Sequence, residues 1–341
     1  MKKLRVLVLM HEDLVPPDSL QGVSEEEMMA WKAEFDVVAT LREMGHEARP
    51  LGVRDELSVV RSAILDGRPH IAFNLLEEFH GVGLYDQHVV SYLELMKQPY
   101  SGCNPRGLML THDKPLMKKI LAFHRIRSPR FTVFTRHRKI VPGRQLSFPL
   151  LVKSTTEDAS LGISADSVVH DDKQLKDRVH YVHERIQTDA IAEEYIEGRE
   201  IYMGVLGNQR LQTLPVWEMH FSRMPEDVPR IATAKVKWDI AYQKKHGIRT
   251  AEAKNLPPGM EREVAQLSRR AYRALHLSGY ARMDYRLSEE GQLYLLEANA
   301  NPNLSYGEDF AESAHAIGLP YDALLQRIVN LGLRYQAAWQ G

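Results

Sequence analysis

The chain has 341 residues, of which 44% are hydrophobic and 26% charged, a composition typical of globular proteins with room for two or three packed domains. Its 44 Lys and Arg against 45 Asp and Glu leave a net charge of −1, which excludes a general field that recruits nucleic acid or an acidic membrane. No apolar run approaches the roughly 20 residues of a membrane span. The single cysteine, Cys103, excludes an internal disulfide and fits a reducing compartment, so we expect a cytoplasmic protein with Cys103 in its core.

The first hundred residues alternate strand and helix patterns. Arg5 interrupts the apolar run at 4–10, so this segment is expected to be a strand rather than a signal peptide. Ser24 and Glu27 have the spacing of a capping box, which predicts a helix that ends near Gly45. Three further elements follow, a helix at 57–65, a strand at 70–75 and a helix at 86–97. This order predicts an open parallel α/β sheet.

Gly81 and Gly83 form a short G-x-G in this region. A dinucleotide fingerprint needs a third glycine, but Asp86 occupies that position. We therefore expect these glycines to shape a loop at the carboxyl end of a strand, where α/β sheets bind ligands.

A β-hairpin is predicted near the end of the chain, with strands at 281–287 and 292–300 around the turn at 288–291. If Leu287 pairs with Gln292, Arg282 lies opposite Glu297. The other pairs expected on that face are Asp284 with Leu295 and Tyr280 with Asn299, and the core face carries Met283, Tyr285, Leu287, Tyr294 and Leu296. One face of the hairpin therefore gathers a guanidinium, two carboxylates and an amide.

Asp284, Glu297 and Asn299 supply the oxygen ligands that Mg²⁺ prefers. The alternative is that Arg282 merely neutralises Glu297 in a cross-strand ion pair. The spacing alone leaves both interpretations open.

Two lysines upstream favour a phosphate site. Lys114 stands in the first turn of a helix that begins at 113–115, where a cation is unfavourable unless an anion lies nearby. Lys153 ends an apolar strand and leads into the small polar loop 154–162, whose backbone N–H groups could bind phosphate. The acidic segment 192–200 would instead meet ribose hydroxyls or the amino group of adenine, unless it is a solvated surface.

Several motifs then occur in a recognisable order. They are HGVG at 80–83, PYSG at 99–102, Asp113-Lys114, FPLLVK ending at Lys153, AEEYIEGRE at 192–200, ARMDYRL at 281–287 and LYLLEANANPN at 293–303. Together they resemble the ATP-grasp ligases, most closely the D-alanine-D-alanine ligase group, over nearly the whole chain.

The resemblance implies a mixed α/β and α+β chain, with an N-terminal open parallel α/β domain followed by a two-subdomain ATP-grasp fold. The expected divisions are 1–103 for the N-terminal domain, 104–190 for the central small subdomain and 191–341 for the C-terminal subdomain with the metal and catalytic residues.

The resemblance also assigns residues to ATP and to the metal. The ATP set is Lys114, Lys153, Ser160, Glu193, Glu194, Tyr195, Ile196 and Glu200, and the Mg²⁺ (or Mn²⁺) set is Asp284, Glu297 and Asn299. Arg282 would face the reacting carbonyl. Lys237, in a charge-rich segment at 221–259 that we expect to be a lid, would reach phosphate, and Lys235 is the competing choice.

The implied reaction is an ATP-dependent carboxylate-amine ligation, in which an acyl phosphate forms and an amine displaces phosphate to give an amide or peptide bond. Small amino-acid or peptide substrates are expected as partners, with no nucleic acid, no membrane and a possible homodimer. Residues expected to line the substrate pocket are His80, Asn301, Asn303, Ser305 and Glu308. An ATP-grasp small-molecule kinase and a non-catalytic ATP-binding regulatory protein remain as alternatives.

Two positions depart from the resembling group. The phosphate loop usually reads Gly-Ser-Ser but here contains Asp158, Ala159 and Ser160, so one hydroxyl is missing. Glu308 stands where those enzymes place a serine that holds the acceptor carboxylate. Because a glutamate repels a carboxylate, the acceptor is expected to carry a cation or to lack a carboxylate at that place.

Overall fold

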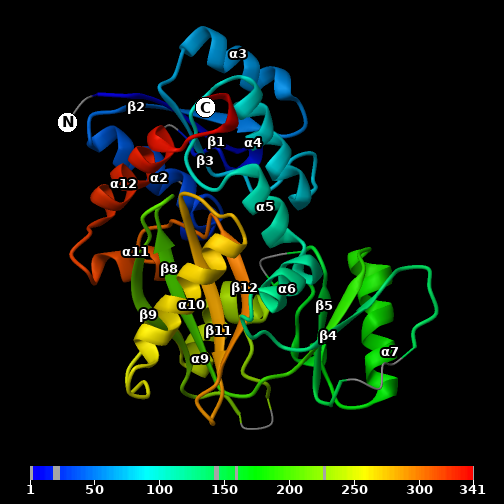
Figure 1. Cartoon of the computed structure of the whole chain (residues 1–341). Helices are drawn as coiled ribbons and strands as arrows, with labels where there is room; N and C mark the ends of the chain where they lie inside the picture. Colours follow the sequence, from blue (N-terminus) through cyan, green and yellow to red (C-terminus); the bar gives the residue numbers. More distant parts are fainter. Residues whose placement is uncertain (1–2, 18–23, 142–145, 158–159, 226–227, 341) are drawn as a thin grey trace.

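The N-terminal part is a parallel sheet in the order β2-β1-β3, as the alternation of strands and helices predicted (Figure 1). The computed structural model describes residues 3–17, 24–141, 146–157, 160–225 and 228–340. The strands are β1 (Arg5–His11), β2 (Glu47–Val53) and β3 (Ile71–Asn74), and the helices are α1 (Glu25–Ala30), α2 (Lys32–Glu43), α3 (Leu57–Gly67) and α4 (Asp86–Leu95).

Two details of this part differ from the sequence prediction. The helix expected from Ser24 to Gly45 is divided at Trp31 into α1 and α2, and the side chain of Glu27, which the capping box needs, lies outside the described residues. Strand β2 was not predicted, because Pro50 and Gly52 have low strand propensity.

Helices α5 (Pro105–His112) and α6 (Lys114–Phe123) lead from this sheet to a second one. The Asp113 side chain accepts a hydrogen bond from the Leu116 N–H at 2.8 Å and caps α6, so the helix start predicted at 113–115 is confirmed. The second sheet is antiparallel, with the order β4-β7-β5-β6. Its strands are β4 (Phe131–Phe134), β5 (Leu150–Ser154), β6 (Val168–Val169) and β7 (Ala190–Glu194), and α7 (Asp172–Tyr181) packs on it.

The third sheet is antiparallel, in the order β10-β9-β8-β11-β12. Its strands are β8 (Arg199–Leu206), β9 (Gln212–Phe221), β10 (Ile248–Glu252), β11 (Tyr280–Leu287) and β12 (Leu293–Ala300), accompanied by α8 (Ala234–Trp238), α9 (Ile240–His246), α10 (Met260–Ala274), α11 (Asp309–His315) and α12 (Tyr321–Arg334). The segment 221–259 is therefore not the plain loop we expected, since it contains α8, α9 and β10. Short helical turns complete the chain at Glu12–Leu14, Gly83–Tyr85, Ala165–Ser167, Val182–Ile186 and Ala338–Gln340.

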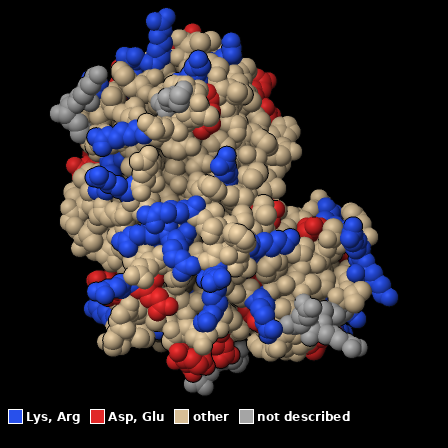
Figure 2. Space-filling view, viewed as in Figure 1, with Lys and Arg blue, Asp and Glu red and all other residues tan. Residues whose placement is uncertain are grey.

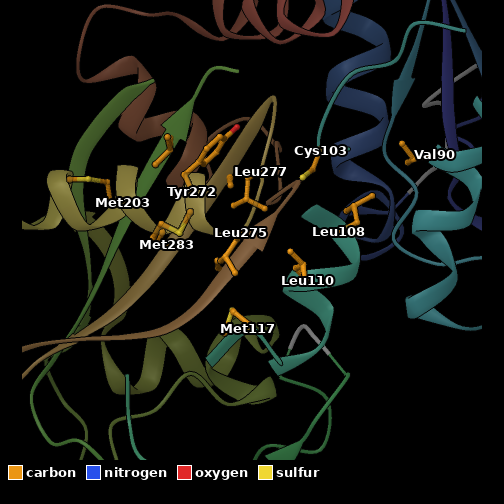
Figure 3. Packing of buried hydrophobic residues seen from close by; sticks show 14 of the residues in the cluster. Val90, Cys103, Leu108, Leu110, Met117, Met203, Tyr272, Leu275, Leu277 and Met283 are labelled. Atoms are coloured by element: carbon orange, nitrogen blue, oxygen red, sulfur yellow. The ribbon is translucent and has the colours of Figure 1, made fainter. Parts of the chain in front are cut away.

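The buried core joins the first and third sheets. Leu7 and Leu9 of β1 belong to the same hydrophobic cluster as Met283 of β11, and Cys103 lies inside that cluster near Leu108 and Leu277 (Figure 3). Burial raises the pKa of the Cys103 thiol to about 12, which agrees with the expected packing role.

The last helix returns to the beginning of the chain. Ile328 and Val329 of α12 pack with Val6 and Val8 of β1, so α12 covers the face of the parallel sheet that α3 and α4 leave open (Figure 1). The second sheet and α7 project to the side (Figure 1). On the face shown in Figure 2, basic and acidic side chains form separate local patches among neutral residues.

Candidate active site

The hairpin of β11 and β12 pairs in a different register from the one expected. Leu287 lies opposite Leu293 instead of Gln292, because Gly291 adopts φ +75° and the Gly291 N–H donates to the Ser288 carbonyl, which makes the turn one residue longer on one side. A β-bulge after Asp284, at the level of Leu296, then shifts the register by one more residue. The two shifts add to an even number, so the carboxylates share a face as predicted.

The individual pairs are therefore corrected. Asp284 lies opposite Glu297 and Arg282 opposite Asn299, in place of the pairs with Leu295 and Glu297 that the sequence suggested; the expected pair of Tyr280 with Asn299 is wrong for the same reason. Between the turn and the bulge, Leu293 and Leu295 are the buried residues of β12, whereas we expected Tyr294 and Leu296 to face the core.

Arg282 is held by two acidic side chains on this face. Its Nε and one terminal nitrogen donate to the two oxygens of Asp284 at 2.8 and 2.9 Å, and its other terminal nitrogen lies 3.1 Å from Asp309 Oδ2. The Asn299 amide nitrogen donates to Asp284 Oδ2 at 2.9 Å. The guanidinium also lies 4.8 Å from the centroid of the Tyr202 ring. These contacts fix the guanidinium beside the two carboxylates.

The donor set at this place fits a hard divalent cation. Burial raises the pKa of Asp284 to about 6, against the effect of Arg282, and the nearby Glu297 raises it further. A cation between the two carboxylates would relieve both effects. Among the described residues no group of three or more His, Cys, Asp or Glu side chains is placed to hold a metal ion. Two carboxylates and the Asn299 amide would leave positions for water or substrate oxygens, as Mg²⁺ commonly requires.

A hollow lies between the second and third sheets. Of the residues predicted for ATP, metal and lid, those that line it are Lys153, Ser160, Glu193, Glu194, Tyr195, Ile196, Glu200, Lys237, Asp284 and Glu297. Lys237 is half-buried, while the competing Lys235 on the same helix is exposed. The hollow encloses about 70 Å³, far less than the several hundred Å³ of a typical ligand pocket, so its walls are closed together.

Glu193 lies between two buried lysines. Its Oε1 is 3.4 Å from Lys153 Nζ and 3.3 Å from Lys118 Nζ. Sequence analysis missed Lys118, which is fully buried and lies one helical turn after Lys114 on α6; that i, i+4 spacing was the available signal. Burial lowers the pKa of Lys118 to about 8, although Glu193 opposes the shift.

Lys114 is directed at the loop that follows β5. Its Nζ donates to the Glu157 carbonyl at 2.7 Å, and its backbone N–H donates to the Thr155 carbonyl at 3.1 Å. The altered residues Asp158 and Ala159 lie outside the described residues. Ser160 Oγ donates to the Ala232 carbonyl at 2.6 Å, which ties the end of this loop to the segment before α8.

The acidic segment 192–200 is held by arginines. Glu200 accepts hydrogen bonds from Arg286 at 2.8 Å and from the Tyr202 hydroxyl at 2.8 Å. Glu194 pairs with the exposed Arg130, and the backbone N–H groups of Glu194 and Tyr195 donate to neighbouring carbonyls. This segment is therefore a wall of the hollow and not the solvated surface that remained open from the sequence.

The residues expected to line the substrate pocket fall into three places. Asn303 Oδ1 accepts from the Ser305 N–H and hydroxyl at 2.7 and 2.8 Å, and the Glu308 N–H donates to the Ser305 carbonyl at 3.2 Å, so these three share one tight turn. Asn301, at φ +52°, accepts from the Cys103 N–H at 2.7 Å. His80 is exposed on an N-terminal loop, where its N–H donates to the Arg54 carbonyl at 2.7 Å.

Helix α2 also reaches this turn, which the sequence did not suggest. Lys32 Nζ donates to the Tyr306 carbonyl at 2.5 Å, and Asp36 accepts from the Tyr306 N–H at 2.8 Å. Lys32 and Asp36 are themselves paired at 2.6 Å. The N-terminal part of the chain thus positions the turn that follows β12.

Comparison with known proteins places this geometry in a family. The family model described as D-ala D-ala ligase C-terminus matches residues 120–330. A protein of Sinorhizobium fredii named uncharacterized protein y4sG is 31% identical over 307 residues, 87% of this chain and 86% of that protein. The D-alanine–D-alanine ligase of Desulfotalea psychrophila is 30% identical over 278 residues, 79% of this chain and 80% of that one.

A solved structure agrees with these relatives. The D-alanine–D-alanine ligase of Bacillus anthracis, described as complexed with ATP, superposes with a TM-score of 0.75 over 97% of this chain and 98% of that one, at 24% identity. The parallel N-terminal sheet and the two antiparallel sheets are thus the fold of that structure. Together with the family model and the relatives, this fold makes the chain an ATP-grasp ligase. The chain belongs to the D-alanine-D-alanine ligase family, as its motifs indicated. No helix in the described part of the chain has the length and apolar character to cross a bilayer.

Proposed function

We propose that this protein uses ATP to join the carboxylate of one amino acid or peptide to the amine of another through an acyl phosphate. The observation that carries the proposal is the convergence of Lys153, Lys237, Asp284 and Glu297 on one hollow, with Arg282 bonded to Asp284. Two cations and a metal-ligating pair facing one another suit a bound triphosphate.

The lysines would neutralise and orient the phosphates. Lys153 is 7% exposed and lies in a wall of the hollow beside Glu193, so its charge acts at low dielectric and is effective on an anion. Lys237 approaches from α8 on the other side. Glu193 would accept from the adenine amino group and Glu200 from a ribose hydroxyl, because an acid in this wall suits donors rather than phosphate.

Asp284, Glu297 and Asn299 would hold Mg²⁺ or Mn²⁺. When bound, the metal supplies charge neutralisation on the transferring phosphoryl group and on the phosphate oxygens. Arg282 keeps a terminal nitrogen near Asp309 and would stabilise the oxyanion that forms when the amine attacks the acyl phosphate, the role that fixed donors have in acyl transfer.

The substrates would sit in the turn after β12. Asn303 and Ser305 are ordered there by their own hydrogen bonds, and Glu308 follows in the same turn. Two of the proteins named above, from Desulfotalea psychrophila and Bacillus anthracis, are D-alanine–D-alanine ligases. Because Glu308 brings a negative charge, we propose an acceptor that carries a cation or lacks a carboxylate there.

The coarser features of the molecule also remain proposals. They are the three-part division at 103 and 190, a possible homodimer, and a cytoplasmic location, which the single buried Cys103 supports. None of them is needed for the reaction.

The test is incubation with ATP, Mg²⁺ and a panel of amino acids and dipeptides, with phosphate release and product mass measured together. A ligase releases phosphate only when both substrates are present and gives a product lighter than their sum by one water. A phosphorylated product would identify a kinase, and nucleotide binding without turnover across the panel would identify a regulatory protein.

Glu297→Gln keeps the shape of the side chain and removes one metal-ligating charge. We expect turnover to fall by at least about 10³-fold, since the carboxylate acts on the transferring phosphoryl group. Glu289→Gln, in the exposed turn of the same hairpin, is the matched control and should leave turnover unchanged. Equal activity of the two variants would contradict the proposed metal site.

A further inference from the structure

Arg286 is a buried cation that lines the hollow and belongs to the motif ARMDYRL, but the proposed reaction gives it no role. It lies on β11 directly opposite Glu200 of β8 and is 3% exposed. One terminal nitrogen donates to Glu200 Oε2 at 2.8 Å and to the Arg230 carbonyl at 2.5 Å, and the other donates to the Gly198 carbonyl at 2.9 Å. Its guanidinium carbon also lies 6.0 Å from the centroid of the Tyr195 ring.

These contacts connect two walls of the hollow. Glu200 and Tyr195 belong to the wall that would face ribose and adenine, and both line the hollow. Arg230 belongs to the segment before α8, in which Ile231 and Ala232 line the hollow. Arg286 is thus bonded at once to a residue proposed for the nucleotide and to the backbone of the covering segment.

Residues 230–232, which we call the covering segment, accept a hydrogen bond at each end. Arg286 holds the Arg230 carbonyl from the third sheet, and Ser160 donates to the Ala232 carbonyl from the loop after β5 at 2.6 Å. Ile231 between them is 4% exposed and lines the hollow. Thr233 then caps α8, and this helix carries Lys237 into the hollow. With both hydrogen bonds formed, the hollow encloses only about 70 Å³.

We infer that Arg286 is a positioning residue that couples recognition of the nucleotide ribose to closure of segment 230–232. Through Glu200 it orients the acceptor of a ribose hydroxyl, and through the Arg230 carbonyl it holds the segment that brings Lys237 to the phosphates. A planar guanidinium can serve three acceptors at once, which a lysine ammonium on a shorter reach cannot do with the same geometry. The inference rests on the proposed function, because it takes the hollow to be the nucleotide site.

The first test uses Arg286→Lys, which keeps the buried charge beside Glu200 but loses the planar guanidinium that bonds to three acceptors. The measurements are hydrogen exchange of segment 228–239 in the protein without nucleotide, and kcat/KM with ATP and with 2′-deoxy-ATP. We expect exchange in this segment to become about tenfold faster, and the preference for ATP over its 2′-deoxy analogue to fall about tenfold, which corresponds to one well-placed hydrogen bond to a charged group.

Arg199→Lys is the matched control. Arg199 lies on β8 of the same sheet, pairs with the carboxylate of Glu218 on the neighbouring strand, and also donates to the carbonyls of Lys254 and Asn255. This substitution should lower the stability to a similar degree while leaving exchange at 228–239 and the sugar preference as in the parent. Equal behaviour of the two variants in both readouts would overturn the inference.

A second variant covers a failure of Arg286→Lys to fold. Glu200→Gln combined with Arg286→Met removes both members of the buried pair, a change that proteins often tolerate better than the loss of one. Because no donor then reaches the Arg230 carbonyl, exchange at 228–239 should rise as in Arg286→Lys, and unchanged exchange would again overturn the inference. The exchange readout needs no turnover, so a protein that made no ligation product would refute the proposed function without touching this result.

Discussion

Lys118 shows how a single buried charge can organise the site. It extends from α6, and its Nζ lies 3.3 Å from Glu193 Oε1 on β7 and 3.4 Å from the Leu296 carbonyl oxygen on β12. Glu193 is 1% exposed, and a buried carboxylate needs cationic partners close by. Lys118 and Lys153 supply them together, so the two lysines hold the Glu193 side chain in the wall that would face adenine.

The burial of Lys118 predicts a pH-dependent stability. Its pKa is about 8 in the folded protein against the ordinary 10.5, so its charge costs stability below pH 8, and this cost disappears as the pH rises from about 8 to above 10.5. Lys118→Met removes this cost at pH 7. At pH 10 the parent has already lost most of the cost, so the substitution gains little stability there. The free energy of unfolding of the variant, relative to the parent, should therefore fall by on the order of 2 kcal/mol between pH 7 and pH 10, measured by urea denaturation.

Lys119→Met provides the comparison for this titration. Lys119 is the next residue of α6 and is exposed, so its difference from the parent should be nearly constant over the same pH range. If the free energy of unfolding of Lys118→Met relative to the parent were also independent of pH, the pKa of Lys118 would not be lowered in the folded protein.

The hairpin of β11 and β12 depends on an extra residue. Leu296 forms the bulge that separates two stretches of different pairing, with Leu293 and Leu295 in the core on one side and Glu297 opposite Asp284 on the other. Bulges of this kind redirect side chains next to functional sites. Without the bulge, either Glu297 would turn toward the core or the leucines would turn out of it.

Deletion of Leu296 is the corresponding prediction at the level of the element. It should abolish ATP-dependent phosphate release and cost roughly 3 kcal/mol or more, because a fully buried Leu295 would be exposed or a carboxylate buried without its partner. Leu296→Ala keeps the residue count and should retain turnover with a much smaller loss, since Leu296 is only half-buried. Turnover that survived the deletion would show that the bulge does not set the site.

Hydrogen bonds join the N-terminal part of the chain to the part that contains the third sheet. The Cys103 N–H donates to Asn301 at 2.7 Å, and the Asn104 N–H donates to the Ser278 hydroxyl at 2.9 Å. A Cβ on Gly102, which has φ +91°, would lie 2.5 Å from Asn301 Oδ1. Asn301 directly follows β12, the strand that carries Glu297 and Asn299, so this contact links the N-terminal part of the chain to that strand.

Gly102→Ala is therefore expected to destabilise the protein by two additive effects. The positive φ costs about 1–2 kcal/mol, and the clash with Asn301 adds about 1–3 kcal/mol. Gly45→Ala, at φ +86° with nothing within 4 Å of the new Cβ, should show the first effect alone. Thermal unfolding of both variants measures the difference, and equal losses would mean that the contact of Gly102 with Asn301 does not constrain the molecule.

Much of the site could be inferred from the sequence because it depends on residue types at strand and helix ends. Lys153 at the end of an apolar strand, Lys114 after a helix cap and the acids of the last hairpin were identified in this way, and the structure brings Lys153, Asp284 and Glu297 to one hollow. The pairing partners were wrong, because a turn and a bulge each added one residue. Lys118, Arg286 and the pair of Lys32 with Asp36 were missed, because each has a role only through partners far away in the chain.

By itself, the order of apolar runs, caps and polar strand ends determined that this chain alternates strand and helix in its first hundred residues and ends in a β-hairpin, and which side chains carry charge at the strand ends. These properties are local, since propensity, capping and the period of burial act over a few residues. Only the tertiary structure decided which carboxylate lies opposite which, how α12 returns to cover the first sheet, and where Arg286 reaches the covering segment. Those outcomes depend on the number of residues in turns and bulges and on the burial of charges against distant partners. Neither can be predicted from the pattern of a few neighbouring residues.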